Sequence, residues 1–302
     1  MIQKQRWLPL ITSLLTLTGC QTVLESKTQT EGPKLLPAEL PSYTAGEFFM
    51  FDKGIVNTVQ SKSGNIVEWK NNYNITRRAL SNFVIPDLAW TNRTRKSKGE
   101  TTAHPGTLWP LKVGNRAVIP FNQVITNHDG SDPMTLTRDW ECAVAETATI
   151  SVMAGTFDTY QIICKRFSET SGRLRATRTF YYAPSIGHYV LKEDDYRSNP
   201  DKRQELVAYG FNSTYLPKRE QGELINTLDK TLNRNPDGIA STWTTKSGKV
   251  TAMLVPTTSY RSDEGSSCRE YKSIYNIGGR IGTSNLRNVC KKQGKNSWIR
   301  AN

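Results

Sequence analysis

Short alternating segments separated by turns dominate the chain between Glu47 and Gly210, and they constrain its fold more than any other feature. Apolar residues recur at every second position, or β-branched and aromatic residues predominate, as is typical of strands that bury one face. Turn residues separate the segments, for example at Ser63-Gly64 and Asp129-Gly130. The segments are Glu47–Phe51, Ile55–Val59, Asn65–Trp69, Ala117–Thr126, Leu136–Val144, Thr147–Val152, Phe157–Phe167, Arg175–Tyr182, His188–Lys192 and Gln204–Gly210. The pattern predicts a mainly β protein with an antiparallel β-sandwich or barrel.

The period changes between Pro217 and Pro236. Leu224, Leu228 and Leu232, with Ile225 beside them, lie on one face of a predicted linking helix. This leucine stripe could pack on its own domain or receive a helix of a partner. Beyond the helix, a small carboxyl-terminal β domain is expected, with a tight turn at Gly278-Gly279. Its expected strands lie near Ser241–Thr245, Lys249–Val255, Cys268–Ile277 and Ser297–Arg300.

The amino-terminal segment has the three parts of a secretory signal. Lys4 and Arg6 precede an apolar run of eleven residues, against the roughly 20 that a membrane-spanning helix needs. The run ends in Leu17-Thr18-Gly19-Cys20, which resembles the bacterial lipobox and predicts a mature protein acylated on Cys20. The alternative is an ordinary signal peptide cut elsewhere. In the enteric sorting rule, a residue other than Asp after the lipidated Cys, here Gln21, implies the outer membrane.

The chain of 302 residues exceeds the usual 100 to 200 residues of one domain, so two folded domains are expected. Pro33, Pro37 and Pro41 punctuate a polar stretch after Cys20, which is typical of an extended tether. The predicted parts are a signal peptide (1–19), a lipidated tether (20–44), a β-rich domain (45–211), a helical linker (212–240) and a second β domain (241–302).

Cysteine usage agrees with export to an oxidising compartment. Apart from Cys20, the chain has Cys142, Cys164, Cys268 and Cys290, an even set. Three connectivities are possible, and local pairing within each β domain would close two loops of equal length. Unbridged buried thiols are the alternative. A zinc site is not expected, because no pair has Cys-x-x-Cys spacing and the three histidines are scattered.

The net charge of +13, or +11 once Lys4 and Arg6 are removed with the signal, favours anionic partners. For an exported protein these would be lipopolysaccharide, peptidoglycan or acidic lipid headgroups, and no nucleic acid is expected. Arginine forks match phosphate and carboxylate groups, although each basic stretch could also be a solvated surface. The candidate anion-binding residues are Arg77, Arg78, Arg93, Arg95, Lys96, Lys98, Arg173, Arg175 and Arg178, with Lys291, Lys292 and Lys295 as a further stretch.

Catalytic motifs are missing from the sequence. There is no Gly-x-Ser-x-Gly, Walker-type loop, dinucleotide fingerprint or His-Glu-x-x-His, and no cofactor is expected. His188 is the best candidate for a catalytic histidine, but a lone strand histidine is more often structural. The acidic run Glu193, Asp194 and Asp195 could supply the carboxylate pair of a glycan hydrolase, although a solvated turn explains it more simply.

The carboxyl-terminal segment carries a pattern of spaced motifs. In chain order the motifs are Trp243, Ser247-Gly248, Tyr260, Cys268-Arg269-Glu270-Tyr271, Ile277-Gly278-Gly279-Arg280, Cys290 and Trp298. This segment resembles the carboxyl-terminal module of the rickettsial surface antigen family of outer-membrane lipoproteins. The family's glycine zipper is missing, and Lys291-Lys292-Gln293-Gly294 replaces its usual Asp-Gly. Ahead of the module, Val152–Phe157 and Tyr182–Tyr189 look loosely like uncharacterised bacterial envelope domains.

These observations predict a non-enzymatic, lipid-anchored protein of the outer membrane that faces the periplasm or the cell surface. It would bind an envelope polyanion or contribute to envelope structure. The alternatives are an adaptor or inhibitor of another envelope protein, and a periplasmic glycan hydrolase. Aromatic side chains next to the arginines would suit sugars or lipid headgroups, but the sequence does not show whether Trp69, Trp90 and Trp109 are exposed.

Overall fold

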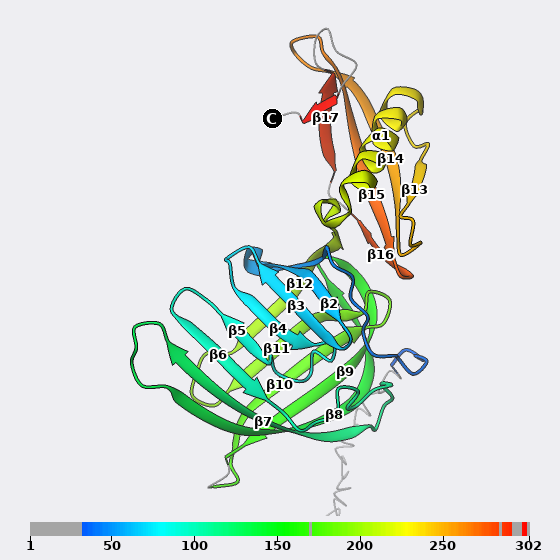
Figure 1. Cartoon of the computed structure of the whole chain (residues 1–302). Helices are drawn as coiled ribbons and strands as arrows, with labels where there is room; N and C mark the ends of the chain where they lie inside the picture. Colours follow the sequence, from blue (N-terminus) through cyan, green and yellow to red (C-terminus); the bar gives the residue numbers. More distant parts are fainter. Residues whose placement is uncertain (1–31, 169–170, 284–285, 292–297, 301–302) are drawn as a thin grey trace, which may run out of the picture. The chain divides into compact units, whose positions relative to one another are not determined.

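The computed structural model describes residues 32–168, 171–283, 286–291 and 298–300. They form a closed barrel of twelve antiparallel strands, one helix and a separate small β sheet (Figure 1). The fold is therefore mainly β, as the strand pattern predicts, and of the two predicted architectures it is the barrel.

Each barrel strand pairs with its neighbours in sequence, and β1 closes the barrel by pairing with both β2 and β12. The strands are β1 (Glu47–Phe51), β2 (Val56–Ser63), β3 (Ile66–Asn71), β4 (Thr76–Leu80), β5 (Ala89–Thr91), β6 (Arg95–Glu100), β7 (Arg116–Asn127), β8 (Met134–Val152), β9 (Gly155–Phe167), β10 (Leu174–Ala183), β11 (His188–Tyr196) and β12 (Lys202–Phe211). All ten predicted segments are strands, but 136–144 and 147–152 belong to one strand, β8. The strands β4, β5 and β6 were not predicted.

The barrel interior is filled mainly by side chains that alternate along the strands. On β8, Trp140, Cys142 and Val144 are buried while Glu141 is exposed, so every second residue faces inward. Fully or almost fully buried aromatic residues, among them Phe49 and Tyr160, occupy much of the interior. Burial of these large apolar side chains is the main stabilising contribution to a fold of this kind.

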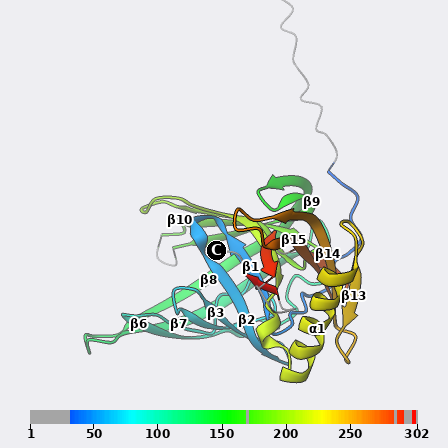
Figure 2. The same ribbon diagram turned by 90° about the horizontal axis from the view of Figure 1, so that it is seen from above.

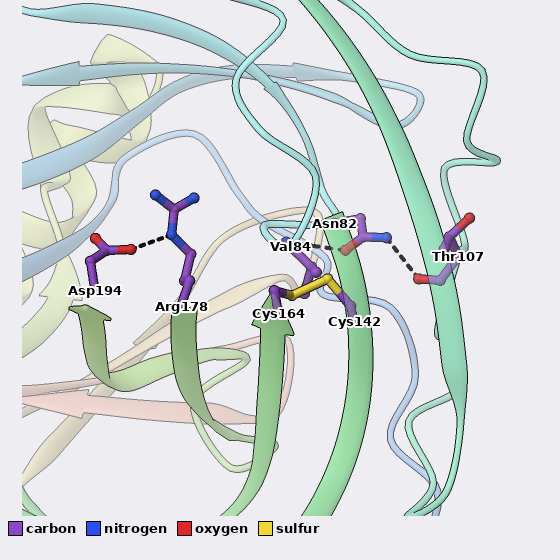
Figure 3. The surroundings of a disulfide bond; sticks show 7 residues. All are labelled: Asn82, Val84, Thr107, Cys142, Cys164, Arg178 and Asp194. Carbon is purple, nitrogen blue, oxygen red and sulfur yellow. Dashed lines mark hydrogen bonds and ion pairs between the residues drawn. A yellow bond between two sulfur atoms is a disulfide. The ribbon is translucent and has the colours of Figure 1, made fainter. Parts of the chain in front are cut away.

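Two connections also enter the core. Asn82, in the β4–β5 loop, is fully buried, and its side-chain amide donates hydrogen bonds to the carbonyls of Pro105 and Thr107 (Figure 3). Its carbonyl oxygen accepts from the backbone N–H of Val84 at 3.2 Å. Asn82 thus ties the β4–β5 loop to the β6–β7 loop. This arrangement fixes Phe83, which packs against Phe180 and Tyr182 of the opposite wall.

Cys20, the predicted signal peptide and the tether up to residue 31 lie outside the described residues. The part of the tether that the structure describes packs against the barrel and is not a free linker. Ala38 exchanges two backbone hydrogen bonds with Leu111, and Tyr43 is 4% exposed. Tyr43 donates to or accepts from Nδ1 of His188 at 2.8 Å, which joins the segment before β1 to the barrel core.

Both sulfur bridges of the local pairing are present in the structure. Cys142 of β8 is bonded to Cys164 of β9, and Cys268 to Cys290, each with a sequence separation of 22. The two residues of each pair stand directly opposite one another on neighbouring antiparallel strands. The first bridge lies inside the barrel, where Cys142 and Cys164 are 2% and 1% exposed (Figure 3).

Replacing both cysteines of the barrel pair, Cys142→Ala with Cys164→Ala, should lower the free energy of unfolding by about 3 kcal/mol. The reason is that the unfolded chain loses the constraint of a closed loop of this length. Denaturant unfolding of the oxidised proteins measures the difference. A variant with the wild-type midpoint would show that the cross-link adds nothing to barrel stability.

The carboxyl-terminal module consists of α1 (Lys218–Arg234), after a short 3-10 turn at Ser213–Tyr215, and a six-stranded sheet. Its strands are β13 (Ser241–Thr244), β14 (Val250–Arg261), β15 (Ser267–Ile277), β16 (Arg280–Thr283), β17 (Arg287–Lys291) and β18 (Trp298–Arg300). Helix α1 lies along β13 and β14 (Figures 1 and 2). The predicted turn at Gly278-Gly279 joins β15 to β16, and both glycines have positive φ.

The leucine stripe of α1 packs on the module's own sheet. Leu224 joins a cluster that contains Trp243, Leu232 contacts a cluster with Tyr271, and Leu228 lies at the edge of both. Ile225, which the sequence places beside the stripe, is 60% exposed. The helix is therefore part of the carboxyl-terminal module. None of the helices that the structure describes is both long and apolar enough for a membrane span.

Candidate functional site

A cavity of about 310 Å³ lies within the barrel and is lined by basic and aromatic side chains. This barrel cavity is at the lower end of the roughly 300 to 1,000 Å³ that is typical of small-molecule sites. Its basic residues are Arg77, Arg138, Arg178 and Lys192, and its one carboxylate is Asp87. Its aromatic residues include Tyr43, Trp69, Phe83, Trp90, Trp140, Phe180, His188 and Tyr189.

The β8–β11 side of the cavity carries most of the positive charge. Strand register places Arg178 of β10 between Cys164 of β9 and Asp194 of β11 (Figure 3). The Arg178 Nε donates a hydrogen bond to Asp194, and the Lys192 ammonium lies 3.0 Å from the other carboxylate oxygen. The Asp194 side chain is only 7% exposed, so one buried carboxylate serves two cations.

Burial, repulsion between the two cations and their attraction to Asp194 together determine the pKa values in this group. Burial, and then the charge of Arg178, lower the pKa of Lys192 to about 8, against the attraction of Asp194. Burial alone would raise the pKa of Asp194, but Arg178 and Lys192 outweigh it and hold that pKa below its usual range. Near neutral pH the group is therefore two cations and one anion.

Two further arginines on the same wall have no acidic partner. Within the described ranges, neither Arg138 of β8 nor Arg166 of β9 forms an ion pair. Burial lowers the pKa of the Arg138 guanidinium, and the charges of Arg166 and Arg178 lower it further. The Arg138 Nε and the Trp140 Nε1 are buried without a hydrogen-bond partner. Both residues face inward from β8 and line the cavity, although these two donor atoms are themselves buried.

The opposite wall, β3 to β5, alternates indole and guanidinium groups. Register places Arg77 of β4 between Trp69 of β3 and Trp90 of β5. The Arg77 guanidinium lies 5.7 Å from the Trp69 ring centroid, within range of a cation–π contact, and 3.7 Å from an oxygen of Asp87. Trp69 is 5% exposed, whereas Trp90 is half-buried and packs on no other ring or cation among the described residues.

His188 lies at the base of the cavity among aromatic rings. Burial, and then the charges of Arg77 and Arg280, hold its pKa well below the usual range, so the imidazole is neutral near pH 7. Its Nδ1 is hydrogen-bonded to the Tyr43 hydroxyl, and its ring centroid lies 4.2 Å from that of Phe49. This histidine joins the amino-terminal segment to the core through the Tyr43 hydroxyl.

The structure brings only two of the nine candidate anion-binding residues to the cavity, Arg77 and Arg178. Arg78 is on the outer face of β4, paired with Glu68 at 3.4 Å. The remaining candidates are exposed on the β5–β6 hairpin or near the start of β10: Arg93, Arg95, Lys96, Lys98, Arg173 and Arg175. Two basic residues of the cavity were not predicted, Arg138 and Lys192, and neither was Arg166, which lies beside the cavity over the Trp140 ring. Their inward placement follows from strand alternation next to Trp140, Cys164 and Phe180.

The other predicted features do not converge on a site. Glu193 and Asp194 face opposite sides of β11, Glu193 pairing with Arg203 at 2.8 Å on the outside. Lys291 lies 5.4 Å from the Trp298 ring in an open hollow on the carboxyl-terminal module, while Lys292 and Lys295 fall outside the described residues. Among the residues that the structure describes, no cluster of His, Cys, Asp and Glu could hold a metal ion.

Comparisons with known proteins give weak likenesses only. No protein-family model matches the chain, and no curated protein matches it. Among solved structures, the hypothetical lipoprotein YmcC from Escherichia coli (K12) aligns with a TM-score of 0.38 and 10% identity, covering 59% of this chain and 90% of that chain. A putative exported protein with a YmcC-like fold from Bacteroides fragilis NCTC 9343 gives a TM-score of 0.34 and 11% identity, covering 57% and 99%. Such low scores carry no argument about function, and the resemblance to rickettsial surface antigens gains no support.

Proposed function

We propose that the protein is a non-enzymatic lipoprotein of the bacterial outer membrane that binds an anionic envelope component in its barrel cavity. The export part of this proposal is supported by the lipobox-like Leu17-Thr18-Gly19-Cys20 and by the even set of remaining cysteines. The binding part is supported by the barrel cavity, which gathers cations and tryptophans from sequence-distant strands.

The unbalanced positive charge of the cavity wall is the observation that carries the binding proposal. The lining residues Arg138, Arg178 and Lys192, with Arg166 beside them over Trp140, have a single carboxylate between them, that of Asp194. Buried cations are costly unless an anion compensates them, and a buried donor without an acceptor costs about 1–3 kcal/mol. A bound carboxylate or phosphate would supply both the charge and the acceptors.

Phosphate, used as a probe, should therefore stabilise the protein more than chloride does at the same ionic strength. The change Arg138→Gln should weaken phosphate binding about 10- to 100-fold, because a hydrogen bond to a charged group contributes about 1.5–3 kcal/mol. The melting temperature as a function of phosphate concentration gives the affinity.

The matched control is Arg78→Gln, which removes an arginine from the outer face of β4, in the opposite wall. This variant should bind phosphate as the wild type does. Equal stabilisation by chloride and phosphate, or equal weakening in both variants, would contradict binding in the barrel cavity.

A further inference from the structure

The barrel cavity offers more than a charge, because its two walls differ in kind. One wall presents the cations of β8 to β11, and the other presents the indoles of Trp69 and Trp90 on either side of Arg77. A small inorganic anion would pair with the cations of the first wall but would make no contact with the indoles of the second. A ligand that spans the cavity must carry an anionic group at one end and a flat apolar face at the other.

Trp90 is the indole that remains available to such a ligand. Arg77 lies over Trp69, which also packs edge-on against Tyr43 with ring centroids 4.9 Å apart. On the other wall, the Trp140 ring has the guanidinium of Arg178 at 4.9 Å and that of Arg166 at 5.8 Å. Trp90 is half-buried, lines the cavity and has neither kind of partner among the described residues.

The polar groups around Trp90 exclude a simple hydrocarbon ligand. Gln123 lines the cavity, and its side-chain amide donates a hydrogen bond of 2.7 Å to the hydroxyl of Ser97. Ser97 is the residue opposite Trp90 on the neighbouring strand. Asp87 provides an acceptor beside Arg77. A ring that combines an apolar C–H face with polar edges would stack on the indole while its hydroxyls meet these groups, as amphipathic surfaces require.

We propose that the cavity binds an acidic sugar, with the sugar ring stacked on Trp90 and its carboxylate or phosphate held by the Arg138 guanidinium, a cation of the cavity lining that forms no ion pair among the described residues. This inference rests on the proposed anion-binding function and names the class of its ligand. The anionic group accepts hydrogen bonds from the Arg138 guanidinium and offsets the charge that Arg138 and Arg166 share. A sugar of one or two rings suits the 310 Å³ of the cavity.

Calorimetric titration of the purified, detergent-solubilised lipoprotein tests this proposal with four probes. Methyl glucuronide and glucose 6-phosphate carry both ring and anion, methyl glucoside carries the ring alone, and inorganic phosphate carries the anion alone. At least one of the two acidic sugars should bind about 10-fold or more tightly than either single-feature probe. Carboxylate and phosphate are thereby distinguished as the preferred anionic group.

Substitutions separate the two walls. Trp90→Leu should weaken binding of the acidic sugar about 3- to 10-fold and leave phosphate binding unchanged, whereas Trp90→Phe should restore most of the loss. Arg138→Gln should weaken both. Phosphate binding without any gain from the sugar ring, or with no effect of Trp90→Leu on the sugar, would overturn the sugar assignment alone. Failure of every anion to bind would overturn the proposed function itself.

Discussion

Replacing Cys20 with serine should abolish acylation of the protein. The thioether through which bacterial lipoproteins carry their first lipid requires the cysteine sulfur, and the lipobox-like Leu17-Thr18-Gly19-Cys20 offers no second thiol. Each buried methylene contributes about 0.8 kcal/mol, so several acyl chains hold a protein on a bilayer almost permanently. The serine variant loses that whole contribution, which makes this the largest effect expected for any single substitution.

Growth with labelled palmitate measures the effect directly. Wild-type protein should carry the label, and the Cys20→Ser variant should carry none. Thr18→Ser is the matched control, because it alters the same motif and keeps the thiol, so its labelling should equal that of the wild type. Label retained on Cys20→Ser would contradict lipid attachment at this residue.

Asp194→Asn should cost about 3–5 kcal/mol in the free energy of unfolding at pH 7. The substitution removes the one carboxylate that Arg178 and Lys192 share, and it leaves two largely buried cations without a counter-charge. Asparagine keeps the shape of the side chain and one hydrogen-bond acceptor, so the decrease in the free energy of unfolding measures the effect of the missing negative charge. The control is Glu193→Gln, an equal change of charge at a half-exposed pair with Arg203, which should cost at most about 1 kcal/mol.

The deficit of Asp194→Asn should shrink as the pH rises from 7 to 9. In the wild type the pKa of Lys192 is already lowered to about 8, and loss of the Asp194 charge lowers it further. The unfolded chain therefore binds more protons than the folded chain, and the free energy of unfolding rises with pH in this interval. The rise is steeper in the variant than in the wild type, because the folded variant has the lower pKa at Lys192. Unfolding measured at both pH values, with and without phosphate, tests the prediction. A constant deficit, or no greater stabilisation by phosphate than in the wild type, would contradict the proposed charge imbalance.

The strand pattern predicts most of the barrel because most strands bury one apolar face. β1 is predicted to the residue, and Gly278-Gly279 is correctly placed in a hairpin turn. The pattern misses β4, β5 and β6, of which β6 reads Arg95-Lys96-Ser97-Lys98-Gly99-Glu100. On these strands the inward positions include Arg77, Trp90 and Ser97, two polar residues and one indole. Alternation of apolar and polar residues is lost where the inside of the barrel is itself polar.

The same reason explains which site residues could be predicted. The run of basic residues from Arg93 to Lys98 predicts an anion site, but its arginines and lysines are all exposed. Such a run cannot form one inward-facing group, because consecutive residues of a strand point to opposite faces. Arg138 and Lys192 stand singly among residues of other kinds, and Arg166 has only Lys165 beside it, so no longer basic run marks them. Their signal is positional, since each lies two residues from a buried inward residue: Trp140, Cys164 and Val190. Only the closure of the barrel shows that these separate strands face one cavity.

The pairing of β1 with β12 has a consequence for biogenesis. β2 follows β1 directly in the chain and can pair with one edge of β1 at once. The other edge of β1 pairs with β12, which is the last barrel strand to be synthesised. Until then the segment Glu47-Phe48-Phe49-Met50-Phe51 presents an open, strongly apolar edge of the type that recruits other chains into aggregates. We therefore expect the nascent protein to need a holding chaperone, or rapid delivery of its last hairpin, to reach the closed state.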